Sequence, residues 1–164
     1  MENGAKPVKA TEEEFFAVLR MIAPGTNFRA ALDGALKTGK GALVVIENEN
    51  TLPLFDGGFR INTQFTSQKL IELTKMDGAI ILSRDAKRIN FANVLLTPSS
   101  KTPSHETGTR HKAAERTARQ AGTLAIAISE RRNEITLFYK NIRYPLVGTD
   151  ELLRKTNENI QLLE

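Results

Sequence analysis

Residues 108–129 read GTRHKAAERTARQAGTLAIAIS, and this stretch decides the fold class. Its first part has the composition of a helix over 109–121, and Gly122 stands where a left-handed glycine commonly ends a helix. The run 124–129 is short and almost entirely apolar, which is typical of a strand buried on both faces. A helix that leads directly into a buried strand predicts a sheet with helices packed on it.

The same two kinds of segment recur along the rest of the chain. Helices are predicted after the capping box of Thr11 and Glu14, from Phe28, after Thr66, over 109–121 and over 150–164. Strand-like apolar runs stand at 42–46, 52–55, 59–61, 79–83, 89–96, 124–129, 134–139 and 142–146. We expect about seven strands and five helices in mixed order. The predicted fold class is α/β of the α+β type, with a mixed, twisted central sheet flanked by helices.

Length and composition bound the kind of protein. A chain of 164 residues with 40% apolar and 26% charged residues suits one globular domain. We expect a flexible segment at 1–10 and a single domain at 11–164. Its last helix either docks on this domain or continues into a longer natural protein. The absence of cysteine excludes disulfides and zinc–thiolate sites. No apolar run approaches the roughly 20 residues of a membrane helix, so a cytoplasmic protein without membrane contact is the expectation.

The glycine-rich stretch 34–41 (GALKTGKG) nearly matches a phosphate-binding P-loop. That motif requires Ser or Thr after its lysine, and here Gly41 follows Lys40. A P-loop also follows a strand and opens a helix, whereas this stretch closes a predicted helix and opens a predicted strand. We therefore interpret it as the turn that ends a helix.

Two other stretches are candidates for a phosphate and metal site. Residues 77–79 (Asp-Gly-Ala) begin a predicted strand, where the carboxylate can bind Mg²⁺ or Mn²⁺ and the glycine lets a ligand approach the backbone. Residues 108–112 (Gly-Thr-Arg-His-Lys) open a helix, whose free N–H groups attract phosphate. Three basic side chains there oppose the helix dipole unless an anion lies nearby. A common Asp-Gly turn and an ordinary helix start remain the alternatives.

Two further features carry weaker signals. Residues 129–133 (Ser-Glu-Arg-Arg-Asn) follow a buried strand and belong either to a ligand cleft or to a charged hairpin turn. His105 is more simply a solvated loop residue than a metal ligand. The net charge of +4, with basic residues concentrated between Arg110 and Arg132, also allows nucleic-acid binding. No DNA-reading motif accompanies that charge.

In this order, these pieces resemble the DisA-type diadenylate cyclase (DAC) family. The matching stretches are 23–26 (Ala-Pro-Gly-Thr), 56–59 (Asp-Gly-Gly-Phe), 75–80 (Lys-Met-Asp-Gly-Ala-Ile), 92–94 (Ala-Asn-Val), 106–111 (Glu-Thr-Gly-Thr-Arg-His) and 128–133 (Ile-Ser-Glu-Arg-Arg-Asn). The family's signature motifs are Asp-Gly-Ala and Arg-His-Arg. Here the second is Arg110-His111-Lys112, and Ala113 stands where relatives often have a hydroxyl residue. Lysine keeps the charge of arginine but lacks its planar fork for phosphate.

The resemblance implies an activity and a set of site residues. The activity is a nucleotidyl transfer that condenses two ATP molecules into cyclic di-AMP and releases pyrophosphate. The implied catalytic residues are Asp77, Arg110 and His111, with Asp77 also the ligand of Mg²⁺ or Mn²⁺. The implied nucleotide-binding residues are Gly78, Ala79, Leu95, Thr109, Lys112, Ser129 and Arg132.

The resemblance also implies an assembly. Each domain would bind one ATP, and two domains would face each other within a homo-oligomer that is an octamer in the family. A helical linker and a helix–hairpin–helix DNA-binding domain normally follow, so DNA would be bound only through parts missing from these residues. The departures at Lys112 and Ala113 leave one alternative open. It is a module that binds ATP or cyclic di-AMP with little turnover.

Overall fold

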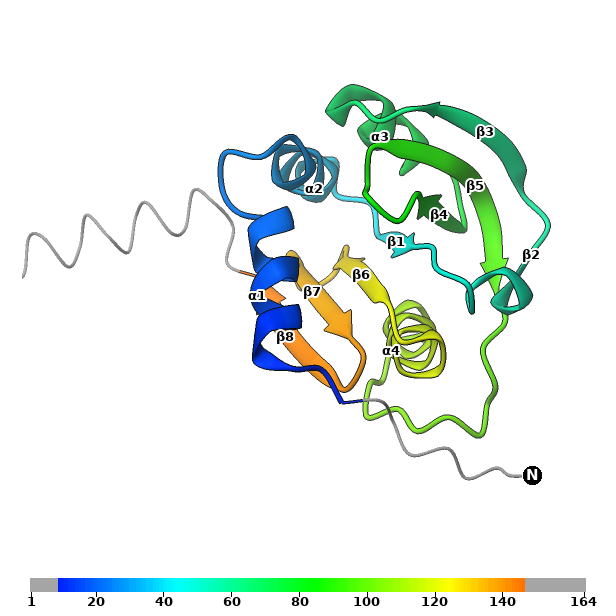
Figure 1. Ribbon diagram of the computed structural model, residues 1–164. Helices are drawn as coiled ribbons and strands as arrows, with labels where there is room; N and C mark the ends of the chain where they lie inside the picture. The colour runs from blue at the N-terminus through cyan, green and yellow to red at the C-terminus, as the bar shows by residue number, and fades with distance from the viewer. Residues whose placement is uncertain (1–8, 147–164) are drawn as a thin grey trace, which may run out of the picture.

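The computed structural model describes residues 9–146, in which one sheet of eight strands lies among helices (Figure 1). The strands are β1 (Ala42–Ile46), β2 (Phe55–Asp56), β3 (Phe59–Gln64), β4 (Ala79–Leu82), β5 (Arg88–Leu96), β6 (Leu124–Ser129), β7 (Glu134–Tyr139) and β8 (Ile142–Leu146). The helices are α1 (Glu12–Met21), α2 (Asn27–Lys37), α3 (Ser67–Leu73) and α4 (Thr109–Ala121), with a 3₁₀ turn, η1 (Leu52–Leu54). The predicted α+β class is confirmed, with eight strands instead of about seven.

The sheet is mixed, as predicted. Its strand order is β2-β5-β4-β1-β6-β7-β8, and β3 also pairs with β5. Only β1 and β4, at the centre, are paired in parallel among the described strands, and the other pairs are antiparallel. A parallel pair needs a long connection, and α3 lies on the segment that joins β1 to β4. Every residue of β1 and β4 is buried, so these central strands are covered on both faces.

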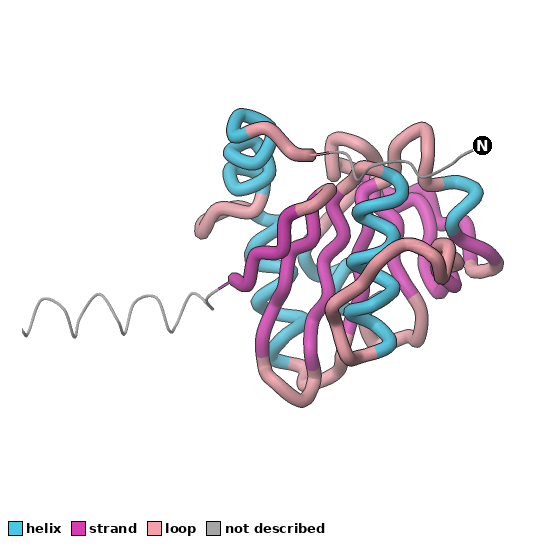
Figure 2. The backbone as a smooth tube through the Cα atoms, turned by 90° about the horizontal axis from the view of Figure 1, so that it is seen from below, coloured by secondary structure: helices cyan, strands magenta, loops and turns pink. Residues whose placement is uncertain are grey.

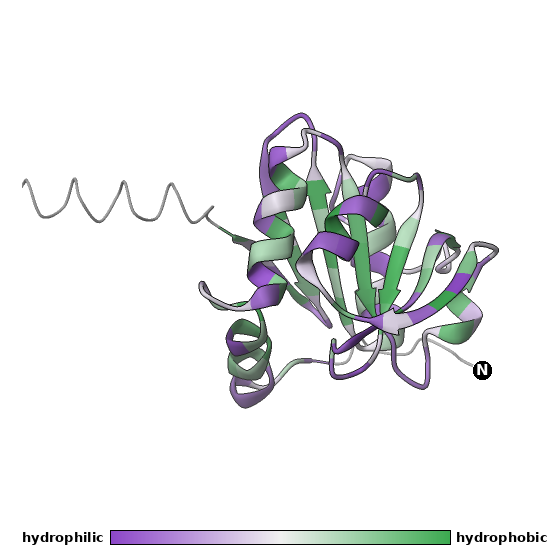
Figure 3. Ribbon diagram, turned by 90° about the horizontal axis from the view of Figure 1, so that it is seen from above, coloured by the Kyte–Doolittle hydropathy of each residue, from purple (hydrophilic) through white to green (hydrophobic). Residues whose placement is uncertain are grey.

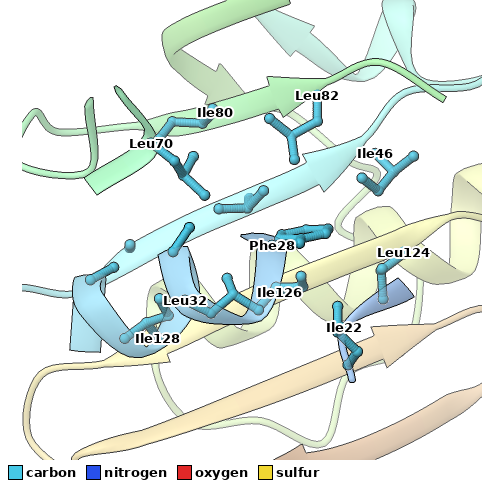
Figure 4. Close-up of a cluster of buried hydrophobic side chains, with 14 of the residues drawn as sticks. Ile22, Phe28, Leu32, Ile46, Leu70, Ile80, Leu82, Leu124, Ile126 and Ile128 are labelled. Carbon is cyan, nitrogen blue, oxygen red and sulfur yellow. The ribbon is translucent and has the colours of Figure 1, made fainter. Parts of the chain in front are cut away.

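Alternation along β1 shows how the two faces are covered. Ala42, Val44 and Ile46 pack in a cluster with side chains of α1, α2 and α3, part of which is drawn in Figure 4. Leu43 and Val45 point the other way and pack with α4. The fold therefore has three layers, with helices on both sides of the strands in Figure 2 and apolar strands between more polar helices in Figure 3.

Three predicted helix ends are confirmed. The capping box is present, since the Glu14 N–H donates to Thr11 Oγ1 at 3.1 Å and the Thr11 N–H donates to Glu14 Oε1 at 2.9 Å. Gly122 ends α4 in the left-handed conformation, with φ of +68°. Helix α2 ends at Lys37, and Gly39 follows with φ of +76°. The stretch 34–41 therefore closes a helix and is not a P-loop.

Other boundaries differ from the prediction. Residues 52–55, predicted as a strand, form η1 and only then enter β2, because Pro53 lacks an N–H for strand pairing and favours the first turn of a helix. Strand β3 runs on to Gln64, past the predicted end at 61, through a bulge with Asn62 at φ of +50°. The predicted helix over 150–164 lies outside the described residues, as does most of the predicted N-terminal segment. Within residues 9–146, each helix is too short or too polar to cross a bilayer.

Candidate active site

A cavity of about 920 Å³ lies on the α4 side of the sheet. It is lined by the start of β4, the end of β5, the start of α4 and the turn after β6, together with Leu43 of β1. Parallel pairing of β1 with β4 and antiparallel pairing of β1 with β6 and of β4 with β5 bring the strand ends to the same end of the sheet, and the start of α4 lies there too. Two motifs far apart in the sequence, at 77–79 and 108–112, therefore meet at one cavity.

The approach to β4 is shaped by Gly78. Its φ is +88°, and a Cβ there would come 2.8 Å from the carbonyl oxygen of Val94 and 2.9 Å from the backbone of Asn93. Only glycine accepts both that conformation and that closeness. The Asn93 side chain donates from Nδ2 to the Asp77 carbonyl oxygen at 2.7 Å. The main chain that carries Asp77 is therefore held against β5, beside the cavity.

The start of α4 presents backbone N–H donors, and no acidic side chain in its first turn competes with an anion for them. Gly108 is the N-cap and offers no side-chain acceptor, and the first turn contains no acidic residue. Thr109 and Arg110 are exposed and line the cavity together with Gly108. Unpaired N–H groups at a helix start, with an arginine beside them, are suited to bind phosphate oxygens.

The turn after β6 closes another side of the cavity. Ser129 is buried, and its Oγ accepts the Arg132 N–H at 3.1 Å. The Arg132 guanidinium donates to Thr107 Oγ1 at 3.4 Å and lies 3.6 Å from Glu134. These contacts join the turn to the segment before α4, so two cationic side chains, Arg131 and Arg132, border the same space as Arg110.

His111 is the buried member of the basic motif. It is 5% exposed, its ring lies edge-on to Phe138 with centroids 6.3 Å apart, and its Nε2 has no hydrogen-bond partner among the described residues. Burial lowers the pKa of His111, and nearby Glu106 opposes that shift. A neutral imidazole therefore borders the cavity near neutral pH.

The long segment before α4 is held by α4 itself. Glu115 accepts the His105 N–H at 2.8 Å, Arg116 Nε donates to the Thr102 carbonyl at 3.0 Å, and Gln120 accepts the Ser99 N–H at 2.8 Å. These contacts hold the segment on α4, and the segment delivers Thr107 and Gly108 to the cavity.

The structure brings most of the predicted site residues together. The cavity is lined by Gly78, Ala79, Leu95, Thr109, Arg110, His111, Ser129 and Arg132. Asp77 and Lys112 are chain neighbours of lining residues and do not line the cavity themselves. His105 is exposed and contributes only a backbone hydrogen bond, so a metal role for it receives no support.

Sequence reasoning missed several lining residues. Leu43, Val94, Leu96 and Thr107 all line the cavity. Strand alternation could have assigned Leu43 and Val94 to the α4 face, but it could not indicate at which point along the strand the packing opens. Thr107 stood within a matching stretch without a role of its own.

Among the described residues no cluster of three or more acidic or histidine side chains could hold a metal by itself, but the carboxylate of Asp77 lies beside the cavity. Asp77 is exposed and supplies carboxylate oxygens next to the backbone at Gly78. Magnesium is commonly bound through one or two carboxylates, with substrate phosphates and waters as its other ligands. Asp77 fits the protein's share of that arrangement.

Curated relatives match nearly the whole chain. The DNA integrity scanning protein DisA of Acetivibrio thermocellus is 49% identical over 154 residues, which are 93% of this chain and 43% of that protein. The DisA protein of Bacillus subtilis is 46% identical over 165 residues, 100% of this chain and 46% of that protein. The chain therefore spans less than half the length of these relatives.

Two solved structures share the fold. A hypothetical membrane spanning protein from Bacillus cereus superposes with a TM-score of 0.68 at 23% identity, over 81% of this chain and 70% of that one. A double mutant of DacA from Staphylococcus aureus superposes with a TM-score of 0.60 at 20% identity, over 88% of this chain and 95% of that one. At these identities the likeness concerns the fold alone.

A family description matches most of the chain as well. Residues 29–142 match the family described as DAC, DisA bacterial checkpoint controller nucleotide-binding. That span runs from α2 to the start of β8 and contains every segment that lines the cavity. The resemblance predicted from the sequence motifs is confirmed, and the chain belongs to the DAC family of DisA-type diadenylate cyclase domains.

Proposed function

We propose that this chain is a diadenylate cyclase domain that joins two ATP molecules into cyclic di-AMP. The observation that carries the proposal is the meeting of the Gly78 backbone and the cationic start of α4 at one cavity. Family membership and the relatives named DisA support it. A volume of about 920 Å³ suits a ligand of nucleotide size.

In the proposed complex the triphosphate lies against the start of α4. The backbone N–H groups after Gly108 and the Arg110 guanidinium bind its oxygens, and Arg132 contributes further positive charge. Thr109 and Ser129 supply hydroxyl groups. His111, buried beside them, donates a hydrogen bond as a neutral imidazole.

The nucleoside lies toward the sheet. Gly78 and Ala79 leave room for the ribose close to the backbone, and exposed Leu95 offers an apolar surface to the adenine. Lys112 stands between two lining residues, His111 and Ala113, without lining the cavity itself, and adds positive charge at longer range. These contacts hold the α-phosphate in a fixed position relative to the edge of the cavity.

The reaction consists of two equivalent transfers. The 3′-hydroxyl oxygen of each ATP attacks the α-phosphorus of the other, an ester bond forms, and the bond to the β-phosphate oxygen breaks. Two protons and two pyrophosphates leave for each cyclic di-AMP formed. The protein's task is alignment and stabilisation of charge on the phosphates.

Asp77 is proposed to hold Mg²⁺ or Mn²⁺ and to orient the attacking 3′-hydroxyl. The metal would supply charge neutralisation at the phosphates when bound. Because one cavity holds one ATP, the proposal requires two subunits whose cavities face each other in a homo-oligomer. Binding to DNA is proposed only for segments of longer relatives that this chain does not span.

A cyclase assay tests the proposal. The purified chain is incubated with ATP and Mn²⁺, and the products are separated by chromatography. Cyclic di-AMP and pyrophosphate are expected in a ratio of one to two. Saturable ATP binding without cyclic di-AMP would instead favour the alternative of a nucleotide-binding module. That alternative is motivated by Ala113, which lines the cavity where relatives often have a hydroxyl residue.

A further inference from the structure

Glu106 is a buried carboxylate two residues before the α4 N-cap. Its side chain is 7% exposed, and it accepts a hydrogen bond from Arg143 Nε of β8 at 2.8 Å. A buried carboxylate is costly unless it is paired. Among the described residues, Glu106 forms its ion pair with Arg143. The two elements joined in this way, the α4 entry and β8, lie 37 residues apart in the chain.

The pair lies next to the cavity without lining it. Thr107 and Gly108, which follow Glu106 directly, both line the cavity, whereas Glu106 and Arg143 do not. On its other side, the Glu106 N–H donates to Ser104 Oγ at 3.2 Å. A main-chain shift of Glu106 that carried its carboxylate toward water would move Thr107 and Gly108, the next two residues, which border the proposed triphosphate site.

The charges around His111 are balanced. Glu106 and Glu134 are the acidic neighbours, and Arg132 and Arg143 are the basic ones. Loss of Arg143 would leave two carboxylates, Glu106 and Glu134, and one guanidinium, Arg132, around His111, which lines the proposed triphosphate site. The unpaired Glu106 would then either remain buried as a charge or turn outward with the segment, and both results oppose triphosphate binding.

We propose that Arg143 is a positioning residue of the nucleotide site. Its guanidinium neutralises Glu106 and thereby keeps Thr107 and Gly108 in place and removes a negative charge from the triphosphate's surroundings. This inference rests on the proposed function for its ligand, ATP, and it adds a residue that the cavity lining does not contain.

The test uses four variants: Arg143→Ala, Arg143→Lys, Glu106→Gln and the double variant R143A/E106Q. ATP affinity is measured by calorimetry without divalent metal, and KM and kcat are measured in the cyclase assay. Arg143→Ala is expected to weaken ATP binding about tenfold and to raise KM, with a smaller effect on kcat, since it leaves a buried charge unpaired. Arg143→Lys restores part of the affinity because it keeps the charge.

The decisive comparison is the double variant. If neutralisation of Glu106 is the role of Arg143, R143A/E106Q binds ATP within about threefold of the wild type, because no buried charge remains. Glu106→Gln alone then binds as well as the wild type. The inference is overturned if the double variant binds ATP as weakly as Arg143→Ala, or if Glu106→Gln alone loses as much ATP affinity. The ion pair would then be merely structural.

Arg84→Ala is the matched control. It removes another Arg–Glu ion pair, that of Arg84 with Glu49, in which both side chains are about 70% exposed. Glu49 follows the last residue of β1 and Arg84 follows the last residue of β4, whereas the cavity lies at the first residues of these strands. The ATP affinity of Arg84→Ala is expected to equal that of the wild type, since exposed pairs contribute little. A loss equal to that of Arg143→Ala would show that any such pair matters and would overturn the inference.

Hydrogen exchange of residues 104–109 separates this inference from the proposed function. Exchange is expected to accelerate in Arg143→Ala and to recover in R143A/E106Q, whether or not cyclic di-AMP is formed. Without cyclic di-AMP from the wild type, the cyclase proposal fails while the exchange and binding series still decide the role of Arg143. Unchanged exchange in Arg143→Ala overturns that role.

Discussion

The guanidinium of Arg110 lies directly against Gly41. A Cβ built on Gly41 would come 2.0 Å from Arg110 Nη1 and 2.3 Å from its Cζ. Gly41 is the residue that disqualifies 34–41 as a P-loop, where Ser or Thr would be required. The same glycine instead leaves the space that an arginine from α4 occupies beside the cavity.

Gly41→Ala is therefore expected to impair the site and spare the fold. The colliding atoms are the far end of a flexible side chain, so Arg110 moves and the backbone stays. Loss of one charge-assisted phosphate contact weakens ATP binding by about tenfold. Calorimetric titration with ATP and thermal unfolding measure the two effects separately.

Gly39→Ala is the matched control for that prediction. Gly39 has φ of +76°, and no atom lies within 4 Å of a Cβ built there. Alanine would therefore strain the backbone without colliding with a neighbouring residue. It is expected to cost about 1 kcal/mol of stability, which lowers Tm by a few degrees. ATP affinity is unchanged. The opposite pattern in the two variants would contradict the packing of Arg110 on Gly41.

Asp77→Asn is expected to abolish cyclic di-AMP formation while the fold stays intact. The exchange is nearly isosteric at an exposed side chain, and the contact from Asn93 is to the Asp77 backbone. Loss of the carboxylate removes the proposed metal ligand and the group that orients the 3′-hydroxyl, which lowers turnover at least about a hundredfold. The check is chromatography of ATP and Mn²⁺ reactions, with Asp85→Asn as an exposed control that keeps its turnover. Wild-type turnover of Asp77→Asn would refute its role.

Lys112→Arg is expected to retain turnover or to raise it. Lys112 is adjacent to the cavity lining and not part of it, so the change restores the family's arginine without adding bulk inside the cavity. Substitutions of this kind commonly change free energies by less than about 0.5 kcal/mol, or about twofold in rate. Steady-state kcat and KM measure the effect. A collapse of turnover would assign the lysine a role of its own.

His111 predicts a pH dependence of stability. Its pKa is lowered in the folded state by burial, so below the unfolded pKa of about 6.5 the unfolded chain binds the proton more readily. The contribution of His111 is therefore fully present above that pH and is lost as pH falls toward its folded pKa.

Urea unfolding of the wild type and of His111→Gln at pH 7 and pH 5.5 measures that contribution. The wild type is expected to lose stability between these values, and His111→Gln to lose less. An equal loss of stability between pH 7 and pH 5.5 in the wild type and in His111→Gln would show that burial does not govern the titration of His111.

Local sequence determined the elements of this fold because their causes are local. The capping box at Thr11, the left-handed glycine at 122 and the apolar run of β6 each act within a few residues, so their positions were predicted correctly. The η1 turn was missed because an apolar run with one proline is compatible with either a strand or a turn. Residues of the motifs at 77–79 and 108–112, which were predicted to belong to a site, also line the cavity.

Tertiary structure alone decided which of these residues share a space. Pairing of β6 with β1, of β1 with β4 and of β4 with β5 brings four strand ends to the same end of the sheet, and no local pattern encodes that register. The contact of Arg110 with Gly41 and the pairing of Glu106 with Arg143 likewise join residues far apart in sequence. Such contacts depend on packing and burial summed over the whole domain, which a linear motif does not contain.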